Sequence, residues 1–324
     1  MSSFYDKKNI LVTGGGGLIG SHLVEALVEE GANVRVAQRS KYNENLNKVN
    51  RHIELINVDL LLVENCLKAV RDMEIVFDLA AMVGNTTDNK IHPGMLFYNN
   101  TRMSSNMLEA ASVENVERYM CSSSNSVYSP NVKIPNIESD GFKGDPDESN
   151  IGYGWAKRFA ELGAVFYSKE YGIKVAIART SNTYGPRDSF TSDKKNVVSG
   201  LIQKVFSGNE KIEVWGSGNQ KRSFIYVKDV IRAMMKLTKN YAVADPVNIG
   251  VDSEISVKEL VTHIVELSGK KLVISFNNKK QERISRRISD TSKIKEKLKW
   301  GPSFTLHEGL KETIDWYCKK FRKM

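Results

Sequence analysis

The stretch that decides the fold is Val12-Thr13-Gly14-Gly15-Gly16-Gly17-Leu18-Ile19-Gly20, near the start of the chain. Gly14, Gly17 and Gly20 have the GxxGxxG spacing. The stretch follows a short apolar strand over 10–12 and opens a predicted helix over 18–30, which a glycine ends. In that order, glycines let the backbone turn tightly and lie against a diphosphate at a helix N-terminus. A plain glycine turn is the alternative, but it requires neither element, so the stretch predicts a dinucleotide site.

Short apolar segments alternate with helical segments through the first half of the chain. After the first strand, the pattern predicts strands over 34–37, 53–58, 75–79, 119–122 and 175–178, and helices over 100–112 and 153–171. Such alternation is typical of a parallel sheet that helices cover on both faces. The sequence therefore predicts an α/β fold with a doubly wound (Rossmann) sheet.

The residue pattern of the sequence changes after Asn182. Glycines and charges scatter over 185–222, and a helix is predicted over 229–238. Ser256 with Glu259, and Thr305 with Glu308, form capping-box patterns before amphipathic runs. We predict a dinucleotide-binding domain over 1–182 with a returning segment at about 220–250. A smaller C-terminal α/β domain over 183–324 is predicted mainly to bind substrate.

A second motif, Tyr153-Gly154-Trp155-Ala156-Lys157, is a YxxxK on a predicted helix. Its spacing places both end residues on one helix face. A lysine ammonium beside a tyrosine favours the phenolate, which can then exchange a proton with a sugar hydroxyl. Alone, YxxxK is typical of an ordinary helix surface. The interpretation as an active site is strengthened by Ser122-Ser123-Ser124, which ends the preceding strand at the sheet's carboxyl edge. A serine run is also typical of a polar loop.

Composition narrows the class of protein. Hydrophobic residues make up 41% and charged residues 26% of the 324 residues, as in globular proteins. No apolar run of about 18 residues predicts a membrane span, and the polar N-terminus has no signal core. Cys66, Cys121 and Cys318 lack metal-ligand spacing. We expect reduced thiols, no metal site and a cytoplasmic location.

The formal net charge of +9 has two explanations. It either spreads over the surface and aids solubility, or attracts anionic small molecules that carry diphosphates. Nucleic acid is a poor third choice, because acidic residues interrupt the basic stretch 279–297 and no aromatic side chains are interleaved there. We expect a small-molecule partner, with neither nucleic acid nor membrane.

Together these motifs resemble the NAD-dependent epimerase/dehydratase family of extended short-chain dehydrogenases. The resemblance runs nearly end to end through TGGGGLIGSH at Thr13, DLAA at Asp78, NNTRMSSNMLEAA at Asn99, SSSNSVY at Ser122, YGWAK at Tyr153, RTSNTYGP at Arg179, VWGSGNQKRSFIYVKD at Val214, VNIG at Val247 and KEKLKWGP at Lys295. It implies an NAD(P)-binding enzyme that modifies a nucleoside-diphosphate sugar by hydride transfer. It also implies a homodimer formed through the helices predicted over 100–112 and 153–171.

Within the family, three segments are similar to the GDP-mannose 3,5-epimerase branch. They are VDLLLVENCLKAV at Val58, YNNT at Tyr98 and KRSF at Lys221. A weaker similarity to the GDP-fucose synthase branch lies in VWGSG at Val214. These similarities imply a GDP-linked sugar.

The resemblance also implies roles for individual residues. The implied catalytic residues are Ser124, Tyr153 and Lys157, the last of which would also hold the nicotinamide ribose. The implied cofactor-binding residues are Gly14, Gly17, Leu18, Ile19, Gly20, Gln38, Arg39, Ser40, Asp59, Leu60, Leu79, Ala80, Ala81, Tyr153 and Lys157. The implied substrate-binding residues are Ser124, Asn125, Ser126, Asn182, Asn196, Val197, Arg222 and Arg287. A solvated surface charge is the alternative for both arginines.

The departures from the family pattern limit the chemistry. Many 4,6-dehydratases carry Asp-Glu where this chain has Asn125 and Ser126. The 3,5-epimerases have Cys in place of Ser126 and Lys in place of Asn196, and GDP-fucose synthases have Cys and His there. Serine and asparagine are poor bases near neutral pH. Elimination and exchange at C3 or C5 therefore lack a base, unless Lys194 or Lys195 replaces it through a one-residue slip.

Hydride transfer at C4 of the sugar is the chemistry that remains. It suits a C4 epimerase, which we favour, or an NAD(P)-dependent 4-dehydrogenase or 4-ketoreductase. A catalytically silent nucleotide-binding regulator is the alternative from another class, and the intact Ser–Tyr–Lys set argues against it.

Cofactor type and oligomeric state complete the expectations. NAD-specific enzymes usually carry an acidic residue at the end of the second strand, where this chain has Gln38-Arg39-Ser40. We therefore slightly favour NADP over NAD. Phe159, Leu162, Val165 and Phe166 are more apolar than one sheet-facing stripe requires, which supports the homodimer.

Overall fold

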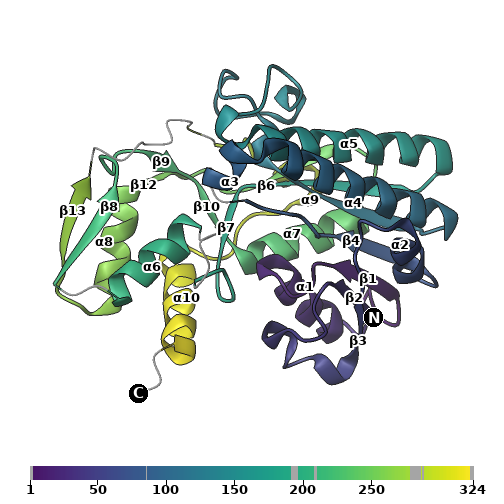
Figure 1. Ribbon diagram of the computed structural model, residues 1–324, viewed down its shortest axis with the longest axis horizontal. Helices are drawn as coiled ribbons and strands as arrows, with labels where there is room; N and C mark the ends of the chain where they lie inside the picture. Colours follow the sequence, from purple (N-terminus) through teal and green to yellow (C-terminus); the bar gives the residue numbers. More distant parts are fainter. Residues whose placement is uncertain are drawn as a thin grey trace.

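The computed structural model of the chain describes residues 3–84, 86–190, 196–207, 210–277, 286 and 288–321. Lys194, Lys195 and Arg287 lie outside the described residues. The described chain forms two lobes, a larger one built on a central sheet and a smaller one at the left of Figure 1.

A seven-stranded sheet, counted over the described residues, forms the centre of the larger lobe. Its order is β11-β6-β5-β4-β1-β2-β3, and all neighbouring strands are parallel. The strands are β1 (Asn9–Thr13), β2 (Asn33–Gln38), β3 (Ile53–Asn57), β4 (Ile75–Asp78), β5 (Arg118–Ser124), β6 (Lys174–Thr180) and β11 (Pro246–Ile249). This order confirms the predicted Rossmann sheet. The order reverses between β1 and β4, where ligands bind such sheets at the carboxyl ends of the strands.

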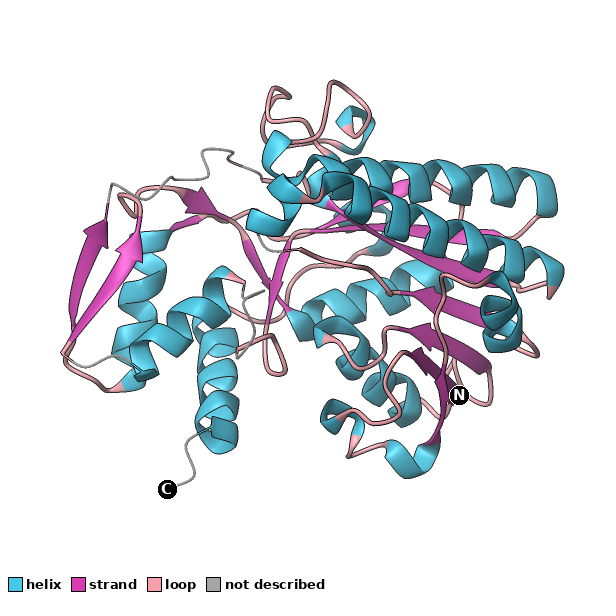
Figure 2. Ribbon diagram, viewed as in Figure 1, coloured by secondary structure: helices cyan, strands magenta, loops and turns pink. Residues whose placement is uncertain are grey.

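Helices cover both faces of the sheet, as Figure 2 shows. Successive β1 side chains point to opposite faces: Leu11 joins one buried cluster, and Ile10 and Val12 join the other. These three β1 side chains are all apolar, because both faces of the sheet are buried. One face is covered by α2 (Val63–Val70), α4 (Pro93–Val113) and α5 (Ile151–Tyr171). The other is covered by α1 (Leu18–Glu29), α7 (Val227–Asn240) and α9 (Ser292–Leu298).

One predicted helix is too short at its N-terminal end. The sequence predicts a helix over 100–112, whereas α4 begins at Pro93. Proline suits the first helical turn because its φ is already helical and it has no N–H to satisfy there. Asn99 and Asn100 interrupt the apolar pattern. The Asn100 amide nevertheless fits inside the fold, since it donates to the Leu96 carbonyl and accepts from the Met82 N–H.

The smaller lobe combines short paired strands with three helices of the described chain. Its strand pairs are β7 (Asn182–Tyr184) with β10 (Phe224–Tyr226), β9 (Lys221–Arg222) with β12 (Ile255–Ser256), and β8 (Lys211–Trp215) with β13 (Val273–Asn277). Its helices are α6 (Val197–Ser207), α8 (Val257–Ser268) and α10 (Leu306–Phe321). Their apolar faces form a third buried cluster. The lobe lies beyond the carboxyl ends of the sheet strands, so a site between the lobes draws side chains from both (Figure 1).

The two predicted capping boxes begin helices of this lobe. Ser256 caps α8 by accepting from the Glu259 N–H, and the Glu259 carboxylate accepts in return from the Ser256 N–H. Thr305 and Glu308 make the same reciprocal pair before α10. Both predictions are confirmed, because a capping box is a local pattern that depends little on the rest of the fold.

The remaining described elements are short. They are α3 (Thr86–Ile91) and the 3₁₀ turns η1 (Glu44–Leu46), η2 (Asn50–His52), η3 (Asn125–Val127), η4 (Glu138–Asp140) and η5 (Glu148–Asn150). Across the described parts of the chain, every helix is too short or too polar to cross a membrane.

Candidate active site

Hydrogen bonds join the carboxyl ends of β1 and β4. The Thr13 hydroxyl donates to the Asp78 carboxylate at 2.7 Å and accepts from the Leu79 and Ala80 N–H groups. Tyr119 of β5 donates to the other Asp78 oxygen at 2.7 Å. Burial raises the pKa of Asp78, and the hydrogen bonds from Thr13 and Tyr119 oppose that rise. These contacts hold the predicted cofactor segment Leu79, Ala80 and Ala81 beside the glycine loop.

The glycine loop leaves the first turn of α1 open to an anion. Gly14 has a φ of +64°, and a Cβ on Gly20 would overlap the Gly14 carbonyl oxygen, so both positions require glycine. Gly17 is the N-cap and supplies no capping side chain, and the first turn contains no acidic residue. The N–H groups that follow, at Leu18 and Ile19, are therefore available to a phosphate. This arrangement fits the diphosphate of a dinucleotide.

Five more of the implied cofactor-binding residues lie at the ends of β2 and β3. Gln38 donates from its amide to the Ser40 carbonyl oxygen at 2.8 Å, and Arg39 between them is exposed. Asp59 and Leu60 follow β3, and the Asp59 carboxylate accepts a backbone N–H two residues further on. The structure thus places these residues at the same carboxyl edge as the glycine loop.

The structure brings the YxxxK pair of α5 against the end of β5. Lys157 is buried, and its Nζ donates to the Ser122 carbonyl oxygen at 2.6 Å. The same Nζ lies 5.5 Å from the centre of the Tyr153 ring. Ser124 ends β5 two residues after this contact. Fixed positive charge beside a half-buried tyrosine is the arrangement that proton exchange with a hydroxyl requires.

The residues after Ser124 form a small hydrogen-bonded turn. The Ser124 Oγ accepts from the Ser126 N–H at 3.1 Å and lies 3.2 Å from the Ser126 hydroxyl. Asn150 donates its amide to the Ser126 Oγ at 3.0 Å. Asn125 and Ser126 are both buried in this turn. Its side chains supply hydroxyl and amide groups, and neither type titrates near neutral pH.

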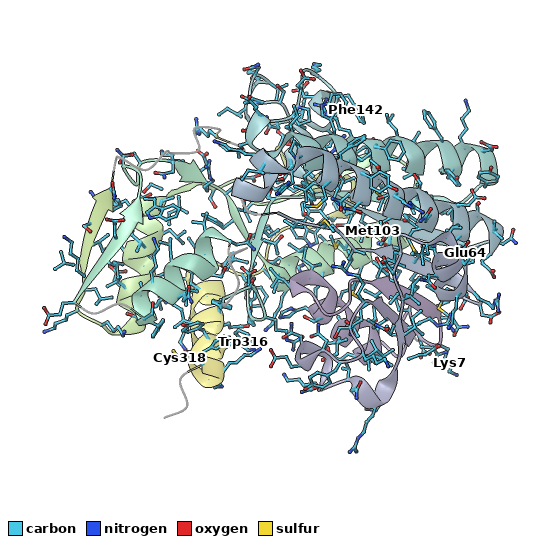
Figure 3. The ribbon with its side chains drawn as sticks, viewed as in Figure 1. Lys7, Glu64, Met103, Phe142, Trp316 and Cys318 are labelled. Atoms are coloured by element: carbon cyan, nitrogen blue, oxygen red, sulfur yellow. The ribbon has the colours of Figure 1, made fainter. Side chains whose placement is uncertain are left out.

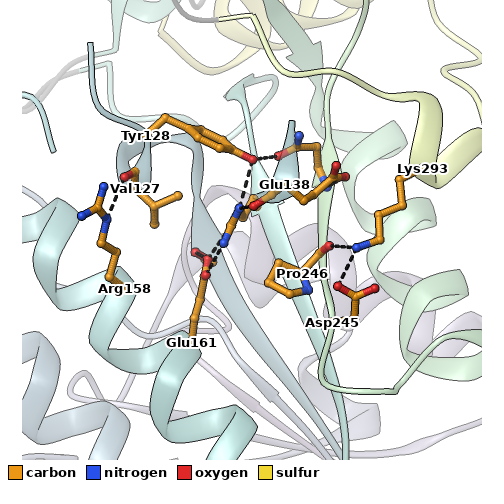
Figure 4. Close-up of polar contacts among 11 residues, drawn as sticks. Val127, Tyr128, Glu138, Arg158, Glu161, Asp245, Pro246 and Lys293 are labelled. Atoms are coloured by element: carbon orange, nitrogen blue, oxygen red, sulfur yellow. Dashed lines mark hydrogen bonds and ion pairs between the residues drawn. The ribbon is translucent and has the colours of Figure 1, made fainter. Parts of the chain in front are cut away.

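A buried ion pair next to this cluster was missed in the sequence. Arg179 of β6 makes two bonds to the Glu161 carboxylate, at 2.8 and 2.6 Å, and both side chains are 1% exposed. The Ser123 hydroxyl also donates to Glu161, and Arg179 donates to the Tyr128 hydroxyl at 3.1 Å. Figure 4 shows Glu161 and Tyr128 of this network. The network ties α5 to β5 and β6. In the sequence, its one sign is that Glu161 follows Lys157 by four residues and so lies on the same helix face.

The predicted substrate residues of the smaller lobe occupy separate loops and strand ends. Asn182 begins β7 and donates to the Ser223 carbonyl at 3.0 Å. Arg222 ends β9 and lines a cavity of about 240 Å³ together with Glu254 and His263. Val197 is exposed at the start of α6. Arg222 therefore lies in the wall of a cavity, whereas Asn182 and Val197 lie on the surface of the smaller lobe.

Asn196 has a partner that the sequence gave no reason to expect. Its amide donates to both oxygens of the Asp188 carboxylate, at 2.9 and 3.1 Å. Burial raises the pKa of Asp188, and hydrogen bonds from the Ser189 N–H and from Asn196 partly oppose that rise. Asp188 is not among the residues predicted from the sequence, because it does not occupy a position at which the family resemblance implies a base. The cavity that Asp188 lines contains Gly17 of the glycine loop rather than residues of the Ser–Tyr–Lys cluster.

Metal and thiol chemistry find little support within the described ranges. Three or more potential metal-ligating side chains gather nowhere among these residues. Cys66 and Cys121 are buried, and burial raises the pKa of the Cys66 thiol to about 12. A thiol with so high a pKa is a poor nucleophile.

The fold and the site define a class of protein. Residues 10–250 match the NAD dependent epimerase/dehydratase family, so the chain belongs to this family. It is an NAD-dependent enzyme of the nucleotide-sugar epimerase/dehydratase type. The predicted family and fold are confirmed.

Relatives narrow this class without naming the reaction. The chain is 33% identical to GDP-mannose 3,5-epimerase 1 of Oryza sativa subsp. indica, over 98% of the chain and 84% of the relative. It is 29% identical to GDP-L-fucose synthase of Sinorhizobium fredii, over 96% and 95% of the two chains. Its fold matches UDP-glucose 4-epimerase of Thermotoga maritima, solved with UDP-glucose, with a TM-score of 0.84 and 30% identity over 96% and 99% of the chains.

Proposed function

We propose that this enzyme inverts the configuration at C4 of a nucleoside-diphosphate sugar. The observation that carries the proposal is the cluster of Lys157, Tyr153 and Ser124 at the carboxyl ends of β5 and the start of α5. Chemistry at C4 requires one proton-exchanging side chain and a nicotinamide. Exchange at C3 or C5 requires a further base.

The side chains of the cluster have separate tasks. Tyr153, as the phenolate, takes the proton of the C4 hydroxyl, while Ser124 donates a hydrogen bond to the same oxygen. Lys157, held by the Ser122 carbonyl, lowers the cost of the phenolate charge. A nicotinamide held beside the glycine loop would supply reversible hydride transfer at C4. Tyr153 returns the proton after the 4-keto sugar has turned its other face, so no net oxidation results.

The groups near Ser126 and Asn196 support inversion at C4 rather than at C3 or C5. Ser126 is held by Ser124 and Asn150, and the Asn196 amide is held by the Asp188 carboxylate. Among the described residues between β7 and α6, Asp188 has the only side chain that can act as a base. It lines the cavity at the glycine loop. The similarity to a UDP-glucose 4-epimerase favours the same carbon.

The nucleotide is proposed to be GDP. The support is the 33% identity with a GDP-mannose 3,5-epimerase over almost the whole chain. We propose that Asn182, Arg222 and Arg287 hold the diphosphate, with guanidinium groups paired to phosphate oxygens. Asn125, Ser126, Asn196 and Val197 would line the sugar and nucleoside positions. Residues 1–182 with the returning segment would bind the dinucleotide, and 183–324 mainly the substrate.

Proton NMR in deuterated water tests this function. GDP-hexoses and UDP-hexoses are incubated with the enzyme and catalytic dinucleotide, and each sugar proton is followed. We expect an inverted C4 with no deuterium in the sugar. Deuterium at C3 or C5 would show that a base is present and would contradict the proposal. If the nicotinamide is instead reduced or oxidised in stoichiometric amounts, the activity is that of a 4-dehydrogenase or a 4-ketoreductase.

The cofactor is proposed to be NADP in slight preference to NAD. Gln38 stands where a carboxylate would repel a 2′-phosphate, and Arg39 is exposed beside it. This feature also favours a 4-ketoreductase, since reductases more often use NADPH. Affinities for NADH and NADPH decide the matter, and Arg39→Met should weaken NADPH binding alone. A large preference of the wild type for NADH would contradict the proposal.

The enzyme is proposed to act as a homodimer through α4 and α5. These helices pack together, and α5 exposes Phe159, Leu162 and Phe166, the last at 60%. Val165, which was also expected on this surface, instead packs against the buried core. Light scattering should give a dimer for the wild type and a monomer for Phe166→Lys. A monomeric wild type at micromolar concentration would contradict this assembly.

A further inference from the structure

The turn that carries Ser124 lies directly against the first turns of α5. A Cβ on Gly154 would lie only 2.7 Å from the Ser126 carbonyl oxygen, so a larger residue there would displace the turn. The next carbonyl of the turn, that of Val127, accepts a hydrogen bond of 2.9 Å from the Arg158 Nε (Figure 4). Gly154 and Arg158 are four residues apart and therefore share one helix face. Contacts at two successive carbonyls thus fix the turn on the helix that carries the YxxxK pair.

Arg158 is the unusual residue of this contact. It is 1% exposed and makes no ion pair among the described residues, whereas the equally buried Arg179 is paired with Glu161. Its Nη2 makes one further, long hydrogen bond of 3.5 Å, to the Lys143 carbonyl oxygen. A buried cation without a countercharge is unfavourable, so other contacts must compensate for its burial.

Two aromatic rings supply that compensation. The Arg158 guanidinium carbon lies 4.7 Å from the centre of the Trp155 ring and 5.6 Å from the centre of the Phe142 ring. Phe142, labelled in Figure 3, belongs to the segment 128–150, which connects the turn to α5. The face of an aromatic ring attracts a guanidinium without accepting its N–H bonds at a lone pair, as a carboxylate would. The rings therefore hold Arg158 beside Val127 and leave its Nε to the carbonyl.

We propose that Arg158 is a positioning residue for the reaction. Through the Val127 carbonyl, it fixes the Ser124 hydroxyl relative to Tyr153. The Ser124 Oγ accepts from the Ser126 N–H inside the turn, so a shift of the turn moves this oxygen with it. The inference rests on the proposed roles of Ser124 and Tyr153, and it does not depend on which sugar reacts or on whether the net reaction is an epimerisation.

Arg158→Met and Arg158→Gln form a matched pair that tests the hydrogen bond to Val127. Both variants lose the charge and keep a side chain of similar size, but only the glutamine amide keeps an N–H donor where arginine has its Nε. We expect kcat with the nucleotide sugar to fall about tenfold to a hundredfold in Arg158→Met and no more than about threefold in Arg158→Gln, because small displacements of reacting groups slow a reaction strongly. The dissociation constant for NADH, measured by fluorescence, should stay within about twofold in both, since Lys157 keeps its bond to Ser122.

Phe142→Leu is the control for the fold of the segment 128–150, because it removes one ring contact and leaves the Arg158 Nε. It should lower stability in urea and change kcat by less than about twofold. Equal kcat in Arg158→Met and Arg158→Gln would overturn the inference, because the hydrogen bond would then contribute nothing. A loss of kcat in Phe142→Leu as large as in Arg158→Met would also overturn it and leave Arg158 as a support for the fold alone.

Gly154→Ala displaces the same turn from the other carbonyl and keeps the inference testable if Arg158→Met does not fold. The added methyl group would overlap the Ser126 carbonyl oxygen. We expect kcat to fall about tenfold with NADH affinity unchanged. Normal kcat in folded Gly154→Ala would overturn the inference, because a displaced turn would then leave the reaction unaffected.

Failure of the proposed function would look different. Amide hydrogen exchange at Ser126, whose N–H bonds to the Ser124 Oγ, reports the order of the turn whether or not a sugar reacts. If no nucleotide sugar is inverted at C4 but this exchange is faster in Arg158→Met than in Arg158→Gln, Arg158 positions the turn and only the assigned reaction is wrong. If C4 inversion is observed with equal kcat and equal exchange in the two variants, the reaction stands and the inference about Arg158 is wrong.

Discussion

The sheet edge of the larger lobe and the polar wall of the smaller lobe are built differently. At the sheet edge, Lys157 and Glu161 are both buried and bond to β5 from one helix face. In the smaller lobe, Asn182 and Asn196 are exposed, and each makes an isolated contact, Asn182 with the Ser223 carbonyl and Asn196 with the Asp188 carboxylate. From this difference we expect regular elements to preorganise the proposed reacting groups, and loops to form the proposed substrate contacts.

The largest effect is expected from Tyr153→Phe. Removing the phenol abolishes proton exchange with the C4 hydroxyl, so kcat should fall by about a thousandfold. NADH affinity should stay within a fewfold, because Lys157 keeps its bond to Ser122. Steady-state kinetics and fluorescence titration measure the two quantities. Substantial kcat in this variant would mean that the reacting groups do not lie at this sheet edge.

The buried Arg179–Glu161 pair tests how strongly the sheet edge depends on its network. Glu161→Gln leaves a buried guanidinium without its countercharge, which should cost about 3–5 kcal/mol of unfolding free energy. The Arg35–Glu54 pair, whose Glu54 side chain is 56% exposed, is the control. Glu54→Gln should cost no more than about 1 kcal/mol. Urea denaturation measures both, and equal losses would remove the distinction between buried and exposed pairs.

Acid should weaken the larger lobe through His22. Burial lowers the pKa of His22 from 6.5 to about 4, so the folded chain keeps this ring neutral while the unfolded chain protonates it. The stability contribution is present above pH 6.5 and is lost as the pH falls from 6.5 towards 4, by about 3 kcal/mol in all.

His22→Gln should flatten this part of the pH dependence. His52→Gln, at an exposed position of η2, is the control and should leave the curve unchanged. Denaturation midpoints across this pH interval measure the effect. A wild type and His22→Gln variant with parallel curves would contradict the assignment.

The smallest effect is expected from the smaller lobe. Arg222→Met should raise KM for the nucleotide sugar about tenfold with little change in kcat, because the lost guanidinium contact acts on binding. Lys221→Met is the adjacent exposed control and should change KM by less than about twofold. If kcat fell as far for Arg222→Met as for Tyr153→Phe, binding and catalysis would not be separated between the smaller lobe and the sheet edge.

Local patterns in the sequence predict most of the larger lobe. The glycine stretch, the YxxxK helix and the alternating apolar strands are each determined by residues close in the chain, and the sheet and helices follow them. The start of α4 at Pro93 could not be predicted, because buried amide bonds of Asn100 compensate for its polar character. Such compensation is tertiary, so periodicity does not reveal it.

The candidate site is less predictable where distant segments meet. Tyr153 and Lys157 are found by spacing, whereas the Glu161–Arg179 pair joins α5 to a later strand. Asp188 was missed because its carboxylate matters only through contact with Asn196 and through burial.

The central claim is that the C4 hydrogen of a nucleoside-diphosphate sugar leaves as hydride and returns to the opposite face of the same carbon. The most direct test uses a substrate with deuterium on C4, incubated in ordinary water and analysed by NMR and mass spectrometry. The account predicts a product with inverted C4 that keeps the deuterium on that carbon. Inverted product that has exchanged this deuterium for solvent protons would contradict it.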